Sequence, residues 1–390
     1  MFSKKDMNKV LHIIYPQPGS NIGGSDLYIL ELSEMFNLYT KCECSILYTR
    51  RGGLSDLIKK RNIRAFFLDE KENNFIKSAF YLNKLLGELR PNMVHTHGYD
   101  ANYLIAVYKI LKKIFRWPEY GCVFAATTHG WIKEPFEILL KTYLDYLTIP
   151  FFDGIVVVDP KQKDLINRFR RKKTIVKYIK TAVRISSPAV IRKCKKHNHL
   201  LQSDPPKEIN MAFIGRLSPE KRVYLAISVY KEIIKSVPCF RGLIIGGGSE
   251  RKRVISSLKN DNPKNRIIFK GYLDKDKTEK EFNNIDILLI TSDSEGCPRV
   301  ALEAMSTKTL VVSRQVGYMG KLIGKNERGL LLTSSEPQII AQEILEFITQ
   351  PKNKIRDILS SAESYVVTNH SPEKFIDEHL KFYTKVYENA

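Results

Sequence analysis

The sequence predicts an α/β protein in which two Rossmann-like, doubly wound domains face a central cleft. Short runs of β-branched residues alternate with longer amphipathic segments, a pattern typical of parallel sheets covered by helices on both faces. The alternation occurs twice, on either side of a non-periodic segment at 186–207. The 390 residues, 43% of them hydrophobic, are enough to bury two cores.

The N-terminal domain is predicted to span residues 1–185. Its expected strands lie at 9–15, 44–49, 64–68, 93–96, 123–128 and 154–158. Segments with helical period lie between them, at 26–36, 75–89, 103–114 and 136–146. In such a unit, ligands bind beyond the carboxyl ends of the strands.

A linker at 186–207 is expected to lead into a C-terminal domain at 208–370. Its expected strands lie at 210–214, 242–245, 267–270, 287–291, 309–313 and 329–332. Its expected helices lie at 224–235, 251–258, 277–282, 298–305 and 337–348. The amphipathic segment 371–390 should form a final helix, which could pack on either domain and for which we favour the N-terminal one.

Composition narrows the class of protein further. No apolar stretch approaches the roughly 18–20 residues that span a bilayer, and the N-terminus lacks a secretory cleavage site. The six cysteines show no metal-ligand spacing beyond the lone C-x-C of Cys42 and Cys44. We therefore expect reduced thiols, no bound metal and a cytoplasmic protein.

The formal net charge of +21 is concentrated in one stretch. Residues 161–196 hold fourteen Lys or Arg and a single acid, Asp164. Such a stretch can bind nucleic acid, anionic lipid headgroups or phosphorylated substrates, and charge alone does not choose among them.

Two cations follow the first strand of the C-terminal domain. Arg216 comes directly after the strand, where its planar guanidinium can bind two oxygens, and Lys221 follows five residues later. The pair suits a diphosphate, although cations at strand ends are also commonly solvated.

The most informative motif follows the strand at 287–291. Glu295, Gly296 and Cys297 form a polar loop, and Pro298 is expected to be the first helical residue. Free amides at this helix N-terminus favour an anion. Glu303 lies more than one turn into the helix, where it could bond ribose hydroxyls or pair with Arg216, Lys221 or another cation.

Glycines at other strand ends allow a ligand to approach the backbone closely. Gly23 and Gly24 precede the first helix, and Gly247 and Gly271 follow later strands. Tyr272, next to Gly271, could contact a base. The dinucleotide fingerprint G-x-G-x-x-G is absent from the first loop, and each glycine is also compatible with a plain turn.

Three histidines lie near strand ends of the N-terminal domain. We expect His129 to reach the cleft, where it could bond a sugar hydroxyl, and His95 to be structural because it alternates into its strand. A zinc site made of these two and His97 would lack supporting outer ligands and is not expected.

Together these features resemble the retaining glycosyltransferases of the GT-B fold, family 4, with its glycosyltransferase group 1 domain. The resemblance covers nearly the whole chain. Its most specific part is the E-x7-E element from Glu295 to Glu303, with Arg216 and Lys221 at the family spacing. The segment 316–321 departs from the family pattern of a Gly-Gly pair followed by Pro-Glu, which makes donor choice less predictable than the diphosphate site.

The resemblance implies a role for each candidate residue. The catalytic residues would be Glu295, His129, Arg216 and Lys221. The nucleotide sugar would contact Gly23, Gly24, Arg216, Lys221, Gly247, Gly271, Tyr272, Glu295, Gly296, Cys297, Pro298 and Glu303. Arg216 and Lys221 would hold the diphosphate, Glu303 the ribose and Glu295 the sugar. No metal or other cofactor is expected, because the two cations and a helix dipole offset the charge of the leaving diphosphate.

Three functions remain open. The first is transfer of a hexose from a nucleotide-diphosphate sugar to a lipid-linked or polysaccharide/lipopolysaccharide-type acceptor, at the inner face of the plasma membrane, with basic segments binding anionic lipid. The second is a nucleotide-sugar epimerase or hydrolase of related fold. The third, a non-catalytic nucleic-acid-binding protein, is disfavoured because no DNA or RNA module accompanies the basic stretch.

Overall fold

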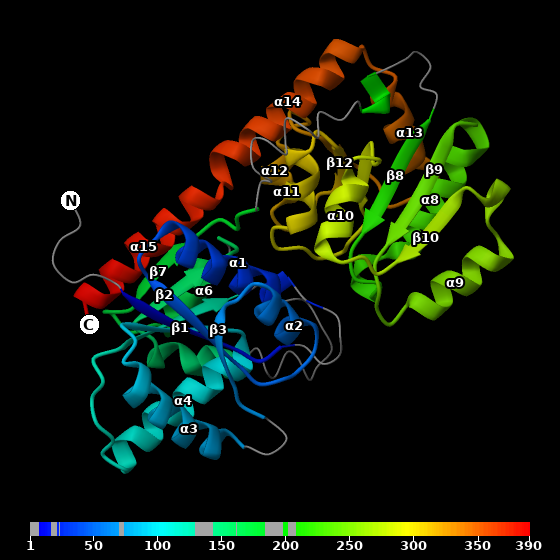
Figure 1. Cartoon of the computed structure of the whole chain (residues 1–390). Coiled ribbons are helices and arrows are strands. Elements are labelled where there is room, and N and C mark those ends of the chain that lie inside the picture. Colours follow the sequence, from blue (N-terminus) through cyan, green and yellow to red (C-terminus); the bar gives the residue numbers. More distant parts are fainter. Residues whose placement is uncertain are drawn as a thin grey trace. The chain divides into compact units, whose positions relative to one another are not determined.

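The computed structural model describes residues 8–16, 22, 24–69, 74–128, 143–160, 162–183, 198–201 and 208–390. The chain divides into two compact units (Figure 1). Unit 1 is Met1–Thr181 with Pro372–Ala390, and unit 2 is Ala182–Ser371. Most of the linker predicted at 186–207 lies outside the described residues.

Unit 1 is built on a seven-stranded parallel sheet with the order β3-β2-β1-β4-β5-β6-β7. The strands are β1 Lys9–Ile14, β2 Glu43–Tyr48, β3 Arg64–Phe67, β4 Met93–His97, β5 Val123–Thr128, β6 Gly154–Val157 and β7 Ile175–Tyr178. The first six coincide with the predicted strands. The edge strand β7 was not predicted, because its four residues lie within the basic stretch and none of them is fully buried.

Helices cover both faces of this sheet. They are α1 Gly24–Tyr39, α2 Gly53–Lys60, α3 Phe75–Leu89, α4 Tyr99–Ile114, α6 Gln162–Phe169 and α15 Pro372–Glu388, with a short 3₁₀ helix η1 at Ile149–Phe151. On one face, Leu82 and Leu86 of α3 and Leu104 of α4 pack with Leu11 and Val94 of the strands. The side chain of Asn74 caps α3 by accepting a hydrogen bond from the Lys77 backbone.

The other face of the unit 1 sheet carries buried imidazoles. His12 of β1 and His95 of β4 are register partners, and both are fully buried. The Tyr383 hydroxyl of α15 lies 2.6 Å from His95 Nδ1, and the Tyr383 ring stacks on Phe36 of α1. The C-terminal helix is therefore part of unit 1, held by polar and aromatic contacts to residues about three hundred positions away.

Unit 2 contains a six-stranded parallel sheet with the order β10-β9-β8-β11-β12-β13. The strands are β8 Ile209–Ile214, β9 Phe240–Ile245, β10 Ile267–Gly271, β11 Ile287–Ile290, β12 Leu310–Arg314 and β13 Leu330–Leu332. The strand order reverses between β8 and β11, so the loops that follow these two neighbours flank the switch point, the usual place for a ligand in an open α/β sheet.

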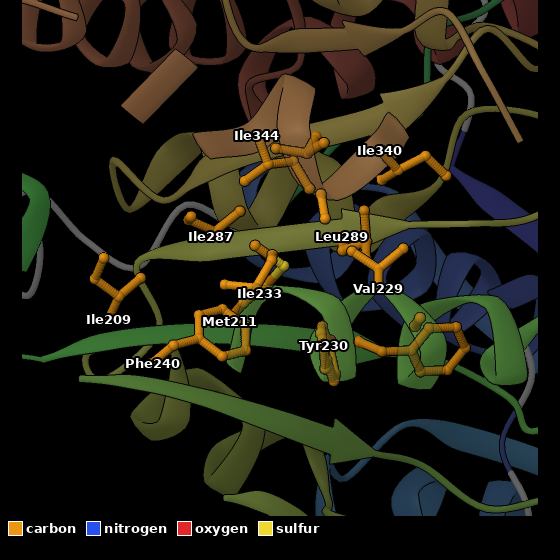
Figure 2. Close-up of a cluster of buried hydrophobic side chains, with 14 of the residues drawn as sticks. Ile209, Met211, Val229, Tyr230, Ile233, Phe240, Ile287, Leu289, Ile340 and Ile344 are labelled. Carbon is orange, nitrogen blue, oxygen red and sulfur yellow. The ribbon is translucent and has the colours of Figure 1, made fainter. Parts of the chain in front are cut away.

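The helices of unit 2 enclose a hydrophobic core (Figure 2). They are α8 Val223–Ser236, α9 Arg251–Asn260, α10 Lys275–Phe282, α11 Arg299–Ser306, α12 Met319–Ile323, α13 Pro337–Ile348 and α14 Lys352–Asn369, with 3₁₀ helices η2 His199–Leu201, η3 Pro219–Lys221 and η4 Pro263–Asn265. Ile233 of α8 and Ile344 of α13 pack with Met211 and Leu289 of the central strands. The two units share the doubly wound α/β architecture that the alternation predicts.

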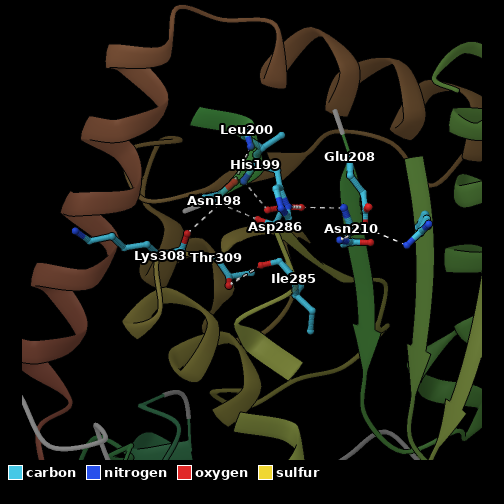
Figure 3. Close-up of polar contacts among 10 residues, drawn as sticks. Asn198, His199, Leu200, Glu208, Asn210, Ile285, Asp286, Lys308 and Thr309 are labelled. Carbon is cyan, nitrogen blue, oxygen red and sulfur yellow. Dashed lines mark hydrogen bonds and ion pairs between the residues drawn. The ribbon is translucent and has the colours of Figure 1, made fainter. Parts of the chain in front are cut away.

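A buried carboxylate stabilises the amino-terminal edge of the unit 2 sheet (Figure 3). Asp286 is fully buried and accepts hydrogen bonds from the backbone amides of His199 and Asn210, each at 2.9 Å. His199 Nδ1 lies 3.1 Å from the same carboxylate. The carbonyl oxygens of Asp286 and Lys308 both accept from the Asn198 side chain, so the segment 198–201 is fixed at the end of the sheet opposite the candidate site.

Candidate active site

The loops after β8 and β11 meet through a direct ion pair. Lys221 Nζ donates to Glu295 Oε1 at 2.6 Å, and the Ser292 hydroxyl donates to the same oxygen at 2.6 Å. The side chains of Lys221 and Glu295 are 23% and 10% exposed, so the pair is accessible but shielded on most sides. A polar pair at the switch point can exchange its internal contact for contacts to a polar ligand.

Further hydrogen bonds hold the two loops in this arrangement. The Thr291 hydroxyl donates to the Lys221 carbonyl at 2.8 Å, and the Asp293 amide donates to the Glu220 carbonyl at 2.9 Å. Asp293 Oδ1 also accepts from Arg222 and Arg314. Because backbone and side-chain bonds act together, the position of Lys221 relative to Glu295 is set before any ligand binds.

The helix α11 begins immediately after this loop. Pro298 is its N-cap, with φ −67° and ψ 120°, and Arg299 is the first helical residue. The prediction that Pro298 is itself the first helical residue is wrong by one position, because its ψ is extended although its fixed φ suits a helix. The Ala301 amide donates to the Pro298 carbonyl at 3.1 Å. The aligned peptide dipoles of α11 give this end of the helix a partial positive charge.

Glu303 lies in the second turn of α11 and is partly exposed. Its backbone carbonyl accepts from the Ser306 hydroxyl at 2.8 Å. Lys221 pairs with Glu295, not with Glu303. Of the pairings left open for Glu303, the one with Lys221 is therefore not found among the described residues.

Arg216 lies at the end of β8, and its side chain is exposed. Within the part of the chain that the structure describes, no acidic side chain forms an ion pair with its guanidinium. The next residue, Leu217, donates its amide to the carbonyl of Gly247 at 2.8 Å, which ties this loop to the glycine-rich loop after β9.

The loops after β9 and β10 join the same edge of the sheet. The Gly246 amide donates to the Gly271 carbonyl at 2.8 Å. Gly246 has φ +150°, and a Cβ there would come within 1.8 Å of the Gly215 carbonyl oxygen, so only glycine fits. Tyr272, one residue beyond Gly271, is half exposed.

The segment that departs from the family pattern packs directly against the Glu295 loop. A Cβ on Gly317, which has φ +51°, would lie 1.6 Å from the Glu295 carbonyl oxygen. The Tyr318 amide donates to the Gly296 carbonyl at 3.0 Å. Sequence reasoning did not assign a role to Gly317, Tyr318 or Ser292; a glycine in the loop that follows a predicted strand was the available signal for the first.

The predicted residues of unit 1 are only partly described. Gly23 and His129 lie outside the described residues, and Gly24 is the first residue of α1. His97 lies with His12 and His95, and one potential ligand atom of each is within 4.8 Å of the others. Because His95 already bonds Tyr383 and the Thr127 hydroxyl through its two ring nitrogens, we interpret these imidazoles as a hydrogen-bonded network.

Burial controls the charge of this network. Desolvation, with a smaller contribution from His379, lowers the pKa of His12 to about 3. Burial likewise lowers the pKa of His379 to about 3; its Nδ1 lies 2.8 Å from the Phe375 carbonyl and its Nε2 lies 2.9 Å from the Tyr28 hydroxyl. Both imidazoles are neutral at physiological pH.

Two parallel α/β units of this kind make up the GT-B fold, which solved glycosyltransferase structures share. Residues 198–365 match the family Glycosyl transferases group 1, and residues 22–186 match Glycosyltransferase Family 4. The chain therefore belongs to glycosyltransferase family 4, as the E-x7-E element indicated.

Similar proteins include the 2-deoxystreptamine glucosyltransferase of Streptomyces kanamyceticus, 25% identical over 46% of this chain and 45% of that protein. The chain thus spans less than half the length of that relative. The O-antigen biosynthesis glycosyltransferase WbnH of Escherichia coli is 24% identical over 90% of this chain and 94% of its own length. Among solved structures, HepE of Anabaena in complex with UDP and glucose has a TM-score of 0.74 at 16% identity, covering 95% and 98% of the two chains.

Among the described residues, no helix combines the length and the apolar composition that a bilayer span requires.

Proposed function

We propose that this protein is a retaining glycosyltransferase that transfers a hexose from a nucleotide-diphosphate sugar to a lipid-linked or polysaccharide/lipopolysaccharide-type acceptor. The observation that carries the proposal is the 2.6 Å contact between Lys221 and Glu295 at the ends of neighbouring strands, beside the N-terminus of α11. This arrangement places a cation beside the leaving diphosphate, which gains negative charge during the reaction. It also places a carboxylate beside the sugar, which gains positive charge.

The positive groups would act on the diphosphate. As the sugar leaves, negative charge grows on the diphosphate, and fixed cations or amide dipoles aimed at it lower the barrier. Lys221 supplies one charge, the exposed Arg216 a second and the N-terminus of α11 a dipole. In this account the reaction requires no metal ion, because these three groups supply the compensating charge.

The carboxylates would orient the donor. Glu295, released from Lys221 by the diphosphate, would bind hydroxyls of the transferred hexose, and Glu303 would bind the ribose. The nucleotide base would contact Gly247, Gly271 and Tyr272. The diphosphate would lie along the backbone of Gly296, Cys297 and Pro298. The Gly317 backbone, which packs on Glu295, would help to hold that carboxylate in place.

The acceptor would bind unit 1. By family resemblance, the Gly23-Gly24 loop and His129 contact the donor or acceptor from that side, and the leaving phosphate takes the acceptor's proton during same-face attack. That mechanism gives retention without an opposed pair of carboxylates. The name of WbnH, an O-antigen biosynthesis glycosyltransferase, supports an acceptor of the polysaccharide/lipopolysaccharide type.

Calorimetric titration with UDP, GDP, ADP and dTDP is the first test, because it determines the donor class. Since HepE is described with UDP and glucose, we expect UDP to bind most tightly of these four nucleotides. Lys221→Ala should abolish the heat of binding, whereas Lys235→Ala, an exposed lysine paired with Glu232, should leave it unchanged. Equal binding by both variants would contradict the site.

Product analysis then distinguishes the reaction. With donor and acceptor present, we expect an α-linked product from an α-linked donor. Free sugar or an epimer formed rapidly from donor alone would instead support a hydrolase or epimerase. Salt-sensitive oligonucleotide binding that survives Arg216→Ala and Lys221→Ala would support a nucleic-acid-binding protein.

A further inference from the structure

Unit 1 exposes a group of large apolar side chains on two neighbouring helices. Ile76 and Phe80 of α3 are 54% and 44% exposed, and Ile110 and Ile114 of α4 are 47% and 64% exposed. Phe115, at the end of α4, is 53% exposed. Single exposed apolar residues are ordinary, but five on one pair of helices are not. We refer to these five residues as the α3–α4 patch.

The patch is continuous across both helices. Ile76 and Phe80 are four residues apart on α3, and Ile110 and Ile114 are four apart on α4, so each pair shares a helix face. The rings of Phe80 and Phe115 lie 5.3 Å apart in an edge-to-face arrangement, which joins the two pairs. The helices α3 and α4 pack side by side (Figure 1).

Cations surround the α3–α4 patch. Residues 74–120 contain seven Lys or Arg and three acids. Lys112 pairs with Glu119 at 2.7 Å, and Lys84 lies 4.0 Å from Glu88. In the described part of the chain, no acidic side chain forms an ion pair with Lys77, Lys113 or Arg116, and all three side chains are exposed. The patch is therefore an apolar surface with an unneutralised positive rim.

We propose that the α3–α4 patch docks unit 1 onto an anionic lipid bilayer. Aliphatic and aromatic side chains on one face of a helix insert at the boundary of headgroups and acyl chains, while neighbouring Lys and Arg bind the anionic headgroups. The structure offers both signals on the same surface. A second copy of the chain is a poorer occupant, because a two-fold contact through this patch would bring Lys113 and Arg116 of each copy near the same like-charged rim.

This surface is separate in sequence from the basic stretch 161–196, which has cations but little exposed apolar surface among its described residues. The inference does not depend on the transferase reaction, since vesicle binding is measured without donor or acceptor. If both proposals hold, the patch would bring the acceptor-binding unit to the membrane that carries the acceptor.

The test is co-sedimentation of the full chain with vesicles of phosphatidylcholine alone and with 30% phosphatidylglycerol. The wild-type protein should bind the anionic vesicles at least fivefold more, and less at high salt. Ile114→Ser with Phe115→Ser should reduce binding to anionic vesicles at least fivefold, as should Lys113→Glu with Arg116→Glu. Ile339→Ser, at a position of unit 2 that is 46% exposed, is the matched control and should bind like wild type.

Tryptophan fluorescence gives a second readout. Trp117 lies 4.9 Å from the Phe80 ring, and the chain has two tryptophans, so Trp131→Phe leaves Trp117 as the reporter. Its emission should shift to shorter wavelength with anionic vesicles. Circular dichroism verifies that each variant is folded.

Several outcomes would overturn the proposal. They are absence of binding to anionic vesicles, undiminished binding by both patch variants, or loss of binding only when Lys172 and Lys173 of the basic stretch are changed to Glu. A wild-type dimer that becomes a monomer in Ile114→Ser with Phe115→Ser, without any vesicle binding, would identify the patch as a contact between copies instead.

Discussion

Gly317 lies against Glu295 so closely that a Cβ on Gly317 would stand 1.6 Å from the Glu295 carbonyl oxygen. The loop after β12 therefore determines the position of the loop that carries the candidate sugar-binding carboxylate. This close approach explains why position 317 is a glycine with φ +51°, although the segment 316–321 otherwise departs from the family pattern.

Gly317→Ala should lower turnover at least tenfold while the protein stays folded, because the added methyl group displaces the Glu295 backbone. The matched control is Gly320→Ala in the same segment, where a Cβ would meet nothing closer than 3.6 Å. Steady-state kinetics on both variants measure the effect. Equal turnover by the Gly317→Ala and Gly320→Ala variants would mean that catalysis tolerates a displacement of the Glu295 loop.

Lys221→Ala and Glu303→Ala should each lower kcat at least tenfold, equivalent to about 1.4 kcal/mol or more of lost transition-state stabilisation. Lys221→Ala also leaves Glu295 without its ion-pair partner, so we expect weaker nucleotide binding as well. Lys235→Ala serves as the control. Normal turnover in both site variants would show that the active site lies elsewhere.

Chelation should leave the reaction intact. Because Arg216, Lys221 and the α11 amides supply positive charge, activity after dialysis against EDTA should stay within twofold of the untreated enzyme. Restoration of a lost activity by Mg²⁺ or Mn²⁺, measured in the same assay, would contradict this prediction.

Asp286→Ala should destabilise unit 2 by about 2–4 kcal/mol, because it leaves two buried amides and the His199 imidazole without their acceptor. Asp286→Asn keeps one carbonyl acceptor, so its stability should lie between that of the alanine variant and that of the wild type. Denaturant unfolding monitors the change. At concentrations where the variants are folded, nucleotide affinity should be unchanged, since Asp286 lies at the far end of the sheet.

Stability should fall as the pH drops from about 6.5 toward 3. Burial holds the pKa values of His12 and His379 at about 3, whereas in the unfolded chain these imidazoles titrate near 6.5. The unfolded state thus binds more protons than the folded state in this pH interval. As the pH falls, the free energy of unfolding therefore decreases by about 1.4 kcal/mol per pH unit for each imidazole. His379→Gln should reduce the slope of the unfolding free energy against pH; an unchanged slope would exclude His379 as a contributor.

Most of the fold could be predicted because it depends on local patterns. Alternation of buried strands with amphipathic helices identified the doubly wound class and twelve of the thirteen strands found in the described residues. The strand β7 was missed because it is short and partly exposed. The helices α2, α6, α12 and α14 were also missed, the first three because they have only five to eight residues and α14 because polar residues separate its apolar positions. The Arg216, Lys221, Glu295 and Glu303 positions could be proposed because their spacing along strand ends is also local.

What the sequence by itself determined is therefore the order of strands and helices and the chemical character of their ends. Only the tertiary structure decided which ends meet. Lys221 and Glu295 are 74 residues apart and touch because β8 and β11 are neighbours in the sheet. Likewise, Tyr383 reaches His95 across 288 residues because α15 packs on unit 1. Contacts of this kind depend on sheet order and helix packing, which hydrophobic periodicity does not encode.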